Sequence, residues 1–165
     1  MFNKIFGGAS KTKTIDAASP LTGKLVPLSE VPDEAFAQGY MGAGGAIEPT
    51  EGVVIAPFDG TVSHLIDTHH AVIVENAAGL QVLIHVGINT VQLKGEGFKA
   101  LVKTGDAVKQ GQTLIEFDAD RIRAAGYPLI TPFLVVSEEH PAESVTCAYG
   151  DVKAGQPAVL QVQIK

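Results

Sequence analysis

The chain of 165 residues contains one cysteine, Cys147, and no CxxC pair. A lone thiol cannot form an intramolecular disulfide, and the usual cysteine signature of a structural zinc site is missing. Charged residues make up only 18% of the chain, and no apolar run approaches the roughly 20 residues that a membrane-spanning helix needs. These absences exclude a disulfide framework and a helical membrane span, and they predict a cytoplasmic protein.

A basic surface is missing as well. The formal net charge of −6 argues against a nucleic-acid partner, whose phosphates require a basic face, and is compatible with a basic protein partner. The opening "MFNKIFGG" is too short for a signal peptide. Its apolar residues have the spacing of an amphipathic turn, but Gly7 and Gly8 interrupt it. We therefore expect membrane contact through this tail to be weak at most.

Glycine, proline and short apolar runs are what the sequence does have. Eighteen glycines and nine prolines separate segments rich in β-branched residues, such as "VVIAPFDGTVSHLI", "AVIVE" and "FLVVS", which is typical of many short strands and tight turns. Only "DEAFAQG", closed by Gly39, and "DADRIRAAG", from Asp118 to Gly126, predict helical turns. We expect a flexible N-terminal tail over residues 1–19 and a single domain over residues 20–165.

Two segments occur twice. "PLTGKLVPLSEV" at Pro20 is repeated as "PFDGTVSHLIDT" at Pro57, and "VKQGQTLI" at Val108 as "VKAGQPAV" at Val152. Each is a strand–turn unit, although reuse of common turn types would give similar echoes. The pattern predicts an all-β fold, an antiparallel β-sandwich with a duplicated strand–turn motif and only short helical turns.

Two histidines flank an expected hairpin in "HAVIVENAAGLQVLIH". If Asn76–Gly79 form its loop, His70 stands directly opposite His85 on one face of the ladder. A three-residue loop with a bulge shifts the register by one residue and places His85 opposite Ala71. The sequence leaves both registers open.

A facing pair of imidazoles suits two kinds of chemistry. A zinc site needs at least three protein ligands or an open position, and no HxH or HExxH pattern completes the set. His69 would point to the opposite face of the strand from its neighbour. Phosphoryl transfer needs less, because one neutral imidazole nitrogen attacks and nearby donors stabilise the charge on the phosphoryl oxygens.

The segments "APFDGTV", "THHAVIVE", "LIHVGINTVQLKGEGF", "VKQGQTLIEFD" and "ITPFLVVS" together resemble the glucose-type enzyme IIA of the bacterial phosphoenolpyruvate-dependent sugar phosphotransferase system. The resemblance runs from about Pro20 to Lys165 and is most specific from His85 to Phe98. It implies a phosphocarrier that accepts a phosphoryl group from the histidine-containing phosphocarrier protein. The group then passes to a cysteine of an enzyme IIB domain.

The resemblance also implies roles for individual residues. His85 of the HxGI motif would be the acceptor, and His70 would stabilise the phosphoryl group. Thr68 would orient His70 by a hydrogen bond, and the Gly87 carbonyl would hold the His85 ring so that its other nitrogen attacks. The implied docking surface for partner proteins includes Phe36, Val91 and Asp33, although core packing would equally explain the apolar residues.

Position 89 departs from the family pattern, which usually has aspartate where this chain has Asn89. Without this carboxylate the chain lacks one attraction for a cationic partner. The chemistry of the acceptor does not require the carboxylate. Family members also bind regulatory targets, and some share a zinc ion with a partner through the two histidines. Here these would be His70 and His85, completed by a carboxylate from the partner; the relay itself requires no cofactor.

Three other classes of protein share parts of the pattern. A lysostaphin-like zinc peptidase would need a third protein ligand, and a lipoyl- or biotin-carrier domain would need a modifiable lysine in a motif such as MKM; the sequence has neither. An enzyme IIB role does not fit Cys147, which lies inside a strand pattern without a phosphate loop. A non-catalytic β-sandwich adaptor with two structural histidines stays open at this point.

Overall fold

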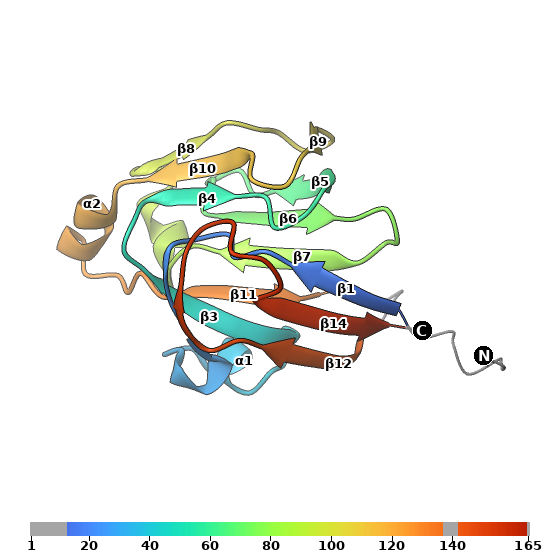
Figure 1. The fold of residues 1–165 in the computed structure, drawn as a ribbon. Coiled ribbons are helices and arrows are strands. Elements are labelled where there is room, and N and C mark those ends of the chain that lie inside the picture. Colours follow the sequence, from blue (N-terminus) through green and yellow to red (C-terminus); the bar gives the residue numbers. More distant parts are fainter. Residues whose placement is uncertain (1–12, 137–141, 165) are drawn as a thin grey trace, which may run out of the picture.

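Eight antiparallel strands form one sheet, and two three-stranded sheets lie beside it (Figure 1). The computed structural model describes residues 13–136 and 142–164, and in these residues the predicted all-β antiparallel fold is confirmed. Across the large sheet the order is β13 (Gly150–Val152), β2 (Gly23–Pro27), β3 (Ala43–Pro49), β11 (Thr131–Val135), β7 (Gln81–His85), β6 (Ala71–Glu75), β5 (Gly60–Leu65) and β9 (Ala107–Val108). The small sheets are β1 (Lys13–Ala17), β14 (Leu160–Ile164) and β12 (Ala142–Cys147), and β4 (Val53–Ile55), β10 (Thr113–Phe117) and β8 (Phe98–Ala100).

All three sheets contribute to the main hydrophobic core. Val162 of β14, Ile115 of β10 and Ile84 of β7 are fully buried in it. The next residue back on β7, Leu83, belongs to a second apolar cluster with Phe36, which is typical of a strand that is buried on both faces. Because side chains alternate along a strand, the last residue of β7, His85, lies on the same face as Leu83.

The duplicated motif is present in three dimensions. Gly23 pairs with Val152 between β2 and β13, and Gly60 pairs with Val108 between β5 and β9, so each proline-containing unit meets one "VKxGQ" unit. Two reciprocal backbone hydrogen bonds join the halves, from Ile55 N–H to the Pro20 carbonyl (2.9 Å) and from Ala18 N–H to the Pro57 carbonyl (2.8 Å). The sequence echoes therefore mark structurally equivalent units.

The repeated glycine of each unit is required by close approach of the backbone. A Cβ at Gly23 would collide with the carbonyl oxygen of Glu48, and a Cβ at Gly60 would collide with that of Glu75. A larger residue would push the neighbouring strand away, so both halves of the sheet depend on the same small residue.

The predicted boundary of the N-terminal tail is wrong for its last part. Lys13–Ala17 forms β1, which pairs along its whole length with β14, and Ala17, Ala18 and Ser19 are buried. This strand was missed because "KTIDA" is mostly polar, and its stability comes from pairing with the other end of the chain. Residues 1–12, with the predicted amphipathic turn, lie outside the described residues. Within the part that the structure describes, no helix is long and apolar enough to cross a membrane.

Both predicted helical turns form. In α1 (Glu34–Ala37) the Asp33 carboxylate accepts from the backbone N–H of Ala35 (2.9 Å). In α2 (Ala119–Ala124) the Asp118 carboxylate accepts from the backbone N–H of Arg121 (3.1 Å). Gly39 and Gly126 follow with positive φ, as glycines after helix ends do. Two 3-10 turns complete the described helical elements, η2 (Leu28–Glu30) and η3 (Thr90–Leu93).

Candidate functional site

His85 is the last residue of β7, and its ladder partner is Ala71 rather than His70. The register with the two histidines directly opposite is therefore wrong, and the register shifted by one residue is the one that forms. The loop explains the shift, because the Asn76 side chain accepts from the backbone N–H of Ala78 (3.0 Å) and of Leu80 (2.9 Å). The Asn76 backbone N–H also donates to the Leu80 carbonyl (3.0 Å) across a three-residue loop, residues 77–79, which ends at Gly79 with a φ of +88°. The ladder continues from this pair, so Glu75 pairs with Gln81.

The two imidazoles meet nevertheless. Their ring centroids are 4.8 Å apart, and the rings are nearly perpendicular at 80°. His70 precedes β6 and follows His69, whose φ is +61°, so its side chain is not bound by the alternation of the strand. The His70 carbonyl accepts from Val86 N–H (2.7 Å), which holds this bend against the end of β7. A distorted backbone thus brings together the rings that the ladder register would separate.

Both rings are oriented through their Nδ1 atoms. His85 Nδ1–H donates to the Gly87 carbonyl (2.8 Å), and because a carbonyl only accepts, the proton of the neutral ring is on Nδ1 and the lone pair is on Nε2. A hydrogen bond of 2.7 Å joins Thr68 Oγ1 to His70 Nδ1. The four residues expected to carry the chemistry, Thr68, His70, His85 and Gly87, are therefore in contact with one another.

The surroundings keep both histidines neutral. Burial lowers the pKa of His70 to about 4, with repulsion from His85 as the smaller cause, and only 2% of the side chain is exposed. Burial also lowers the pKa of His85, although the hydrogen bond to Gly87 and the negative charge of Asp33 act in the opposite direction. At neutral pH the site therefore presents two uncharged imidazoles, one of which has a free lone pair on Nε2.

Two phenylalanines frame the pair. The ring of Phe36 lies 5.3 Å from that of His85, and the ring of Phe98 lies 6.2 Å from that of His70. Phe36, assigned from the resemblance to a docking surface, is 7% exposed and is mainly core packing behind His85. Sequence reasoning missed Phe98, although it ends the segment that resembled the family most specifically.

The remaining predicted docking residues, Asp33, Asn89 and Val91, differ in their surroundings. The Asp33 carboxylate caps α1, the helix that carries Phe36. Asn89 is exposed and has a φ of +63°, a conformation that asparagine tolerates well. Val91 is 46% exposed, so core packing does not account for it. The negative charge of Asp33 acts on His85, and Asn89 and Val91 follow His85 by four and six residues along the chain.

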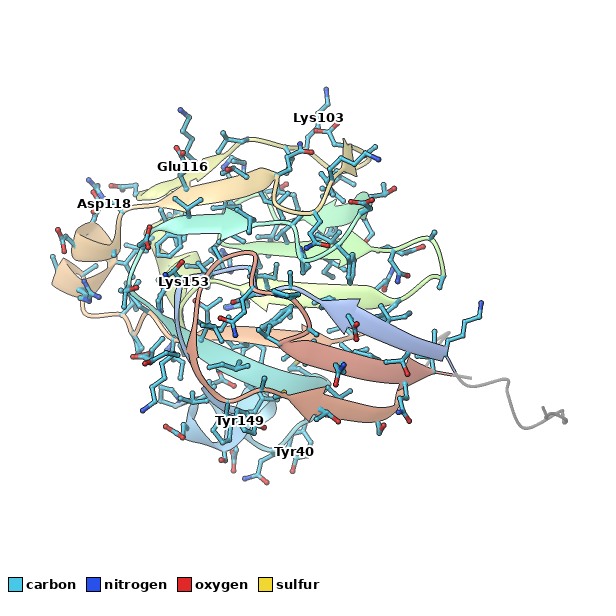
Figure 2. All side chains as sticks on the ribbon, in the orientation of Figure 1. Tyr40, Lys103, Glu116, Asp118, Tyr149 and Lys153 are labelled. Carbon is cyan, nitrogen blue, oxygen red and sulfur yellow. The ribbon has the colours of Figure 1, made fainter. Side chains whose placement is uncertain are left out.

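A groove of about 420 Å³ opens beside His85 on the outer side of the large sheet. Sequence reasoning missed it because its walls come from distant segments. Tyr40, at the edge of the molecule (Figure 2), is 79% exposed, and Met41 is 44% exposed. Two large apolar side chains left in water next to a reactive group indicate a contact surface. Its lining includes Tyr40, Met41, His64, Ile66, Leu83 and His85.

Metal binding by this chain alone is not supported. Residues 13–136 and 142–164 contain no group of three or more histidine, cysteine, aspartate or glutamate side chains that could hold a metal ion. His70 and His85 supply two imidazoles, and a protein zinc site has at least three protein ligands. A metal ion at this pair would need a further ligand from another molecule.

An antiparallel β-sandwich that carries two neutral, oriented imidazoles beside an apolar groove has the features of a protein that passes phosphoryl groups between protein partners. Comparison with known proteins agrees. Residues 15–140 match the family model of the phosphoenolpyruvate-dependent sugar phosphotransferase system, EIIA 1. The chain belongs to this EIIA family, and it is a phosphotransferase component that relays phosphoryl groups together with partner proteins.

Individual relatives cover most or all of the chain. It is 44% identical over its whole length to the PTS system glucose-specific EIIA component of Bacillus anthracis, of which it also covers 100%. It is 46% identical over 91% of its length to the beta-glucoside-specific EIIBCA component of Dickeya chrysanthemi, of which it covers 24%. The solved glucose permease IIA from Mycoplasma capricolum superposes with a TM-score of 0.84 at 27% identity, covering 90% of this chain and 96% of that one. This membership sets aside the zinc peptidase, the carrier domain and the non-catalytic adaptor.

Proposed function

We propose that His85 Nε2 is the phosphoryl acceptor of this chain. The donor is the histidine-containing phosphocarrier protein, and the recipient is a cysteine of an enzyme IIB domain. The observation that carries the proposal is the hydrogen bond from His85 Nδ1–H to the Gly87 carbonyl, since it leaves the lone pair on Nε2 in a ring that touches His70. Fusion of EIIA with EIIB in relatives such as that of Dickeya chrysanthemi supports an enzyme IIB partner.

The chemistry balances without any further reagent. In acceptance, the Nε2 lone pair forms a new P–N bond while the P–N bond of the donor breaks, and the donor leaves as a neutral imidazole. In onward transfer, the cysteine thiolate of enzyme IIB forms a P–S bond while the P–Nε2 bond breaks. The electrons of that bond return to the His85 ring, which keeps its Nδ1 proton on the Gly87 carbonyl.

His70 would stabilise the phosphoryl group. If the Thr68 hydroxyl donates to Nδ1, the His70 proton sits on Nε2 and can be donated to a phosphoryl oxygen. The arriving phosphoryl group carries negative charge next to a ring whose pKa is lowered mainly by burial. We therefore expect the pKa of His70 to rise when His85 is phosphorylated, which would strengthen this donor.

The docking surface would consist of the groove beside His85 together with Asp33, Asn89, Val91 and the rim of Phe36. Its apolar floor and the acidic charge of Asp33 suit a partner that presents apolar residues with a basic rim, and regulatory targets would use the same face. A cytoplasmic location follows from these partners. Glucose is the first sugar to test, since that is the sugar named for the Bacillus anthracis relative.

A shared zinc ion is a second use of the same pair. The Nε2 lone pair of His85 is available to ligate, because its Nδ1–H donates to the Gly87 carbonyl. For His70 to ligate through Nε2, its proton would move to Nδ1, and Nδ1–H would then donate to Thr68 Oγ1. A carboxylate from a regulatory partner would supply the missing ligand. The relay itself requires no cofactor. Zinc-dependent complex formation, measured with and without a chelator, tests this use separately from phosphorylation.

The test of the main proposal is incubation with phosphoenolpyruvate, enzyme I and the phosphocarrier protein, followed by intact-mass measurement. We expect one added phosphoryl group that is labile in acid and stable in alkali, as phosphohistidine is. His85→Ala should gain none, while His69→Asn, a control at the neighbouring half-buried histidine that keeps a residue tolerant of positive φ, should label like the wild type. Full labelling of His85→Ala would mean that another residue is the acceptor.

A further inference from the structure

The peptide unit between Gly87 and Ile88 is held at both of its polar ends. Its carbonyl accepts from His85 Nδ1–H (2.8 Å), and its N–H, which belongs to Ile88, donates to the Pro128 carbonyl (3.1 Å). If this peptide rotated by half a turn, an N–H would face His85 Nδ1 in place of the oxygen. The imidazole proton would then be favoured on Nε2, and the nucleophilic lone pair would be lost.

Glycine makes such a rotation easy. Gly87 has a φ of +75°, and without a Cβ it can exchange between conformations that other residues avoid. The hydrogen bond to Pro128 opposes the rotation from one side only. The orientation of the His85 ring therefore also depends on the contacts of Gly87 itself and of the peptide that precedes it.

Thr90 makes these contacts. Its side chain is fully buried, and its hydroxyl donates to the Val86 carbonyl (2.6 Å), the peptide immediately before Gly87. Its methyl group lies 2.6 Å from the position that a Cβ on Gly87 would take, so it packs directly against the glycine. The Val86 N–H is bound to the His70 carbonyl, so Thr90 closes a chain of contacts that reaches both histidines.

We propose that Thr90 is a positioning residue that holds the Gly87 carbonyl toward His85 Nδ1 and thereby selects the tautomer with a free Nε2. Its effect on phosphoryl transfer rests on the proposed function of His85, but its effect on the tautomer does not. Thr90 touches neither the reacting nitrogen nor the phosphoryl group, and it acts through the backbone from Val86 to Ile88.

The experiment compares three variants by two measurements. Thr90→Val removes the hydroxyl and keeps the shape, Thr90→Ser keeps the hydroxyl and removes the methyl group, and Ser19→Ala is the control. Ser19 is also fully buried, and its hydroxyl donates to the Leu21 carbonyl at the same 2.6 Å, in the other half of the duplicated motif. The measurements are the 15N chemical shifts of His85 at neutral pH and the rate of phosphorylation.

In the wild type we expect 15N shifts of a protonated Nδ1 and an unprotonated Nε2. Thr90→Val should raise the share of the other tautomer by about two- to tenfold, the range that one hydrogen bond supplies, and should slow acceptance to match. Thr90→Ser and Ser19→Ala should keep the wild-type tautomer. Should the valine variant be too unstable to study, Thr90→Cys removes the strong donor at nearly the same volume and should shift the tautomer similarly.

The outcomes are distinguishable. An unchanged tautomer in Thr90→Val, or an equal shift in Ser19→Ala, would overturn the positioning role, even if phosphorylation slowed. An equal shift in Thr90→Ser would overturn the role of the hydroxyl. A shifted tautomer in Thr90→Val together with a wild-type protein that is never phosphorylated would support the positioning role and refute the proposed function of His85.

Discussion

His70 meets His85 edge to face, with ring centroids 4.8 Å apart, although the two residues are not partners in the strand ladder. The contact is made because His70 leaves the strand through a bend at His69. Each ring is then held by a different oxygen, Thr68 Oγ1 or the Gly87 carbonyl. Independent anchoring allows the two imidazoles to have different roles, which the following predictions test.

Replacing the histidines one at a time should damage different steps. His85→Gln removes the attacking nitrogen, so labelling should disappear at any donor concentration. His70→Gln keeps an amide donor, so acceptance should survive while transfer to enzyme IIB slows, by up to about 10²–10³-fold. The reason is that an imidazole can gain or lose a proton as the charged phosphoryl group leaves, and an amide cannot. Rapid-quench time courses of both half-reactions measure this, and equal damage to both steps by His70→Gln would contradict separate roles.

Gly87→Ala should destabilise the protein and abolish acceptance. A Cβ at Gly87 would lie 2.6 Å from the Thr90 methyl group and 2.8 Å from the Pro128 carbonyl oxygen. Gly105→Ala is a matched control, because Gly105 also has a positive φ but has nothing within 4 Å of its Cβ position. We expect Gly87→Ala to cost roughly 1–3 kcal/mol more than the control in urea unfolding, through steric overlap. Equal losses would mean that only backbone conformation matters at Gly87.

His70 should make the folded protein sensitive to acid. Its pKa is about 4 in the folded chain and about 6.5 when unfolded, so the unfolded chain binds more protons between these values. Stability should therefore fall as the pH is lowered from 6.5 toward 4, by at most about 3 kcal/mol. Urea titrations at pH 7 and pH 5 should show a smaller loss in His70→Gln than in the wild type. His69→Gln serves as the control. Identical losses of stability in all three proteins would show that His70 does not cause the acid sensitivity.

Asn89→Asp should strengthen docking to a basic phosphocarrier protein at low salt. Asn89 is exposed four residues after His85, and a carboxylate there would add roughly 0.2–1 kcal/mol of attraction. The gain should fade as salt rises, because exposed charges are screened. Calorimetric titration at two salt concentrations measures it. A dissociation constant that stays the same at low salt would place Asn89 outside the interface.

Local signals in the sequence determined much of the fold. Asp33 and Gly39, and likewise Asp118 and Gly126, mark helix ends because a capping carboxylate and a glycine with positive φ satisfy nearby backbone groups. The repeated "VKxGQ" turns predicted the duplication for a similar reason. In both halves a lysine N–H donates to the glutamine side chain three residues later, at 3.1 Å. The identity of the candidate acceptor, His85, also came from the sequence, through the motif that follows it.

The tertiary structure decided the geometry of the site. Strand β1 is stabilised by pairing with β14, which comes from the other end of the chain. The mostly polar sequence "KTIDA" does not by itself indicate this pairing. The hairpin register depended on a three-residue loop closed by hydrogen bonds of Asn76, and the approach of the two imidazoles depended on a bend at His69. Phe98 and Tyr40 reach the site from separate segments. Sequence patterns encode hydrogen bonds between near neighbours, whereas the distances between side chains of a site are set by how distant strands pair and pack.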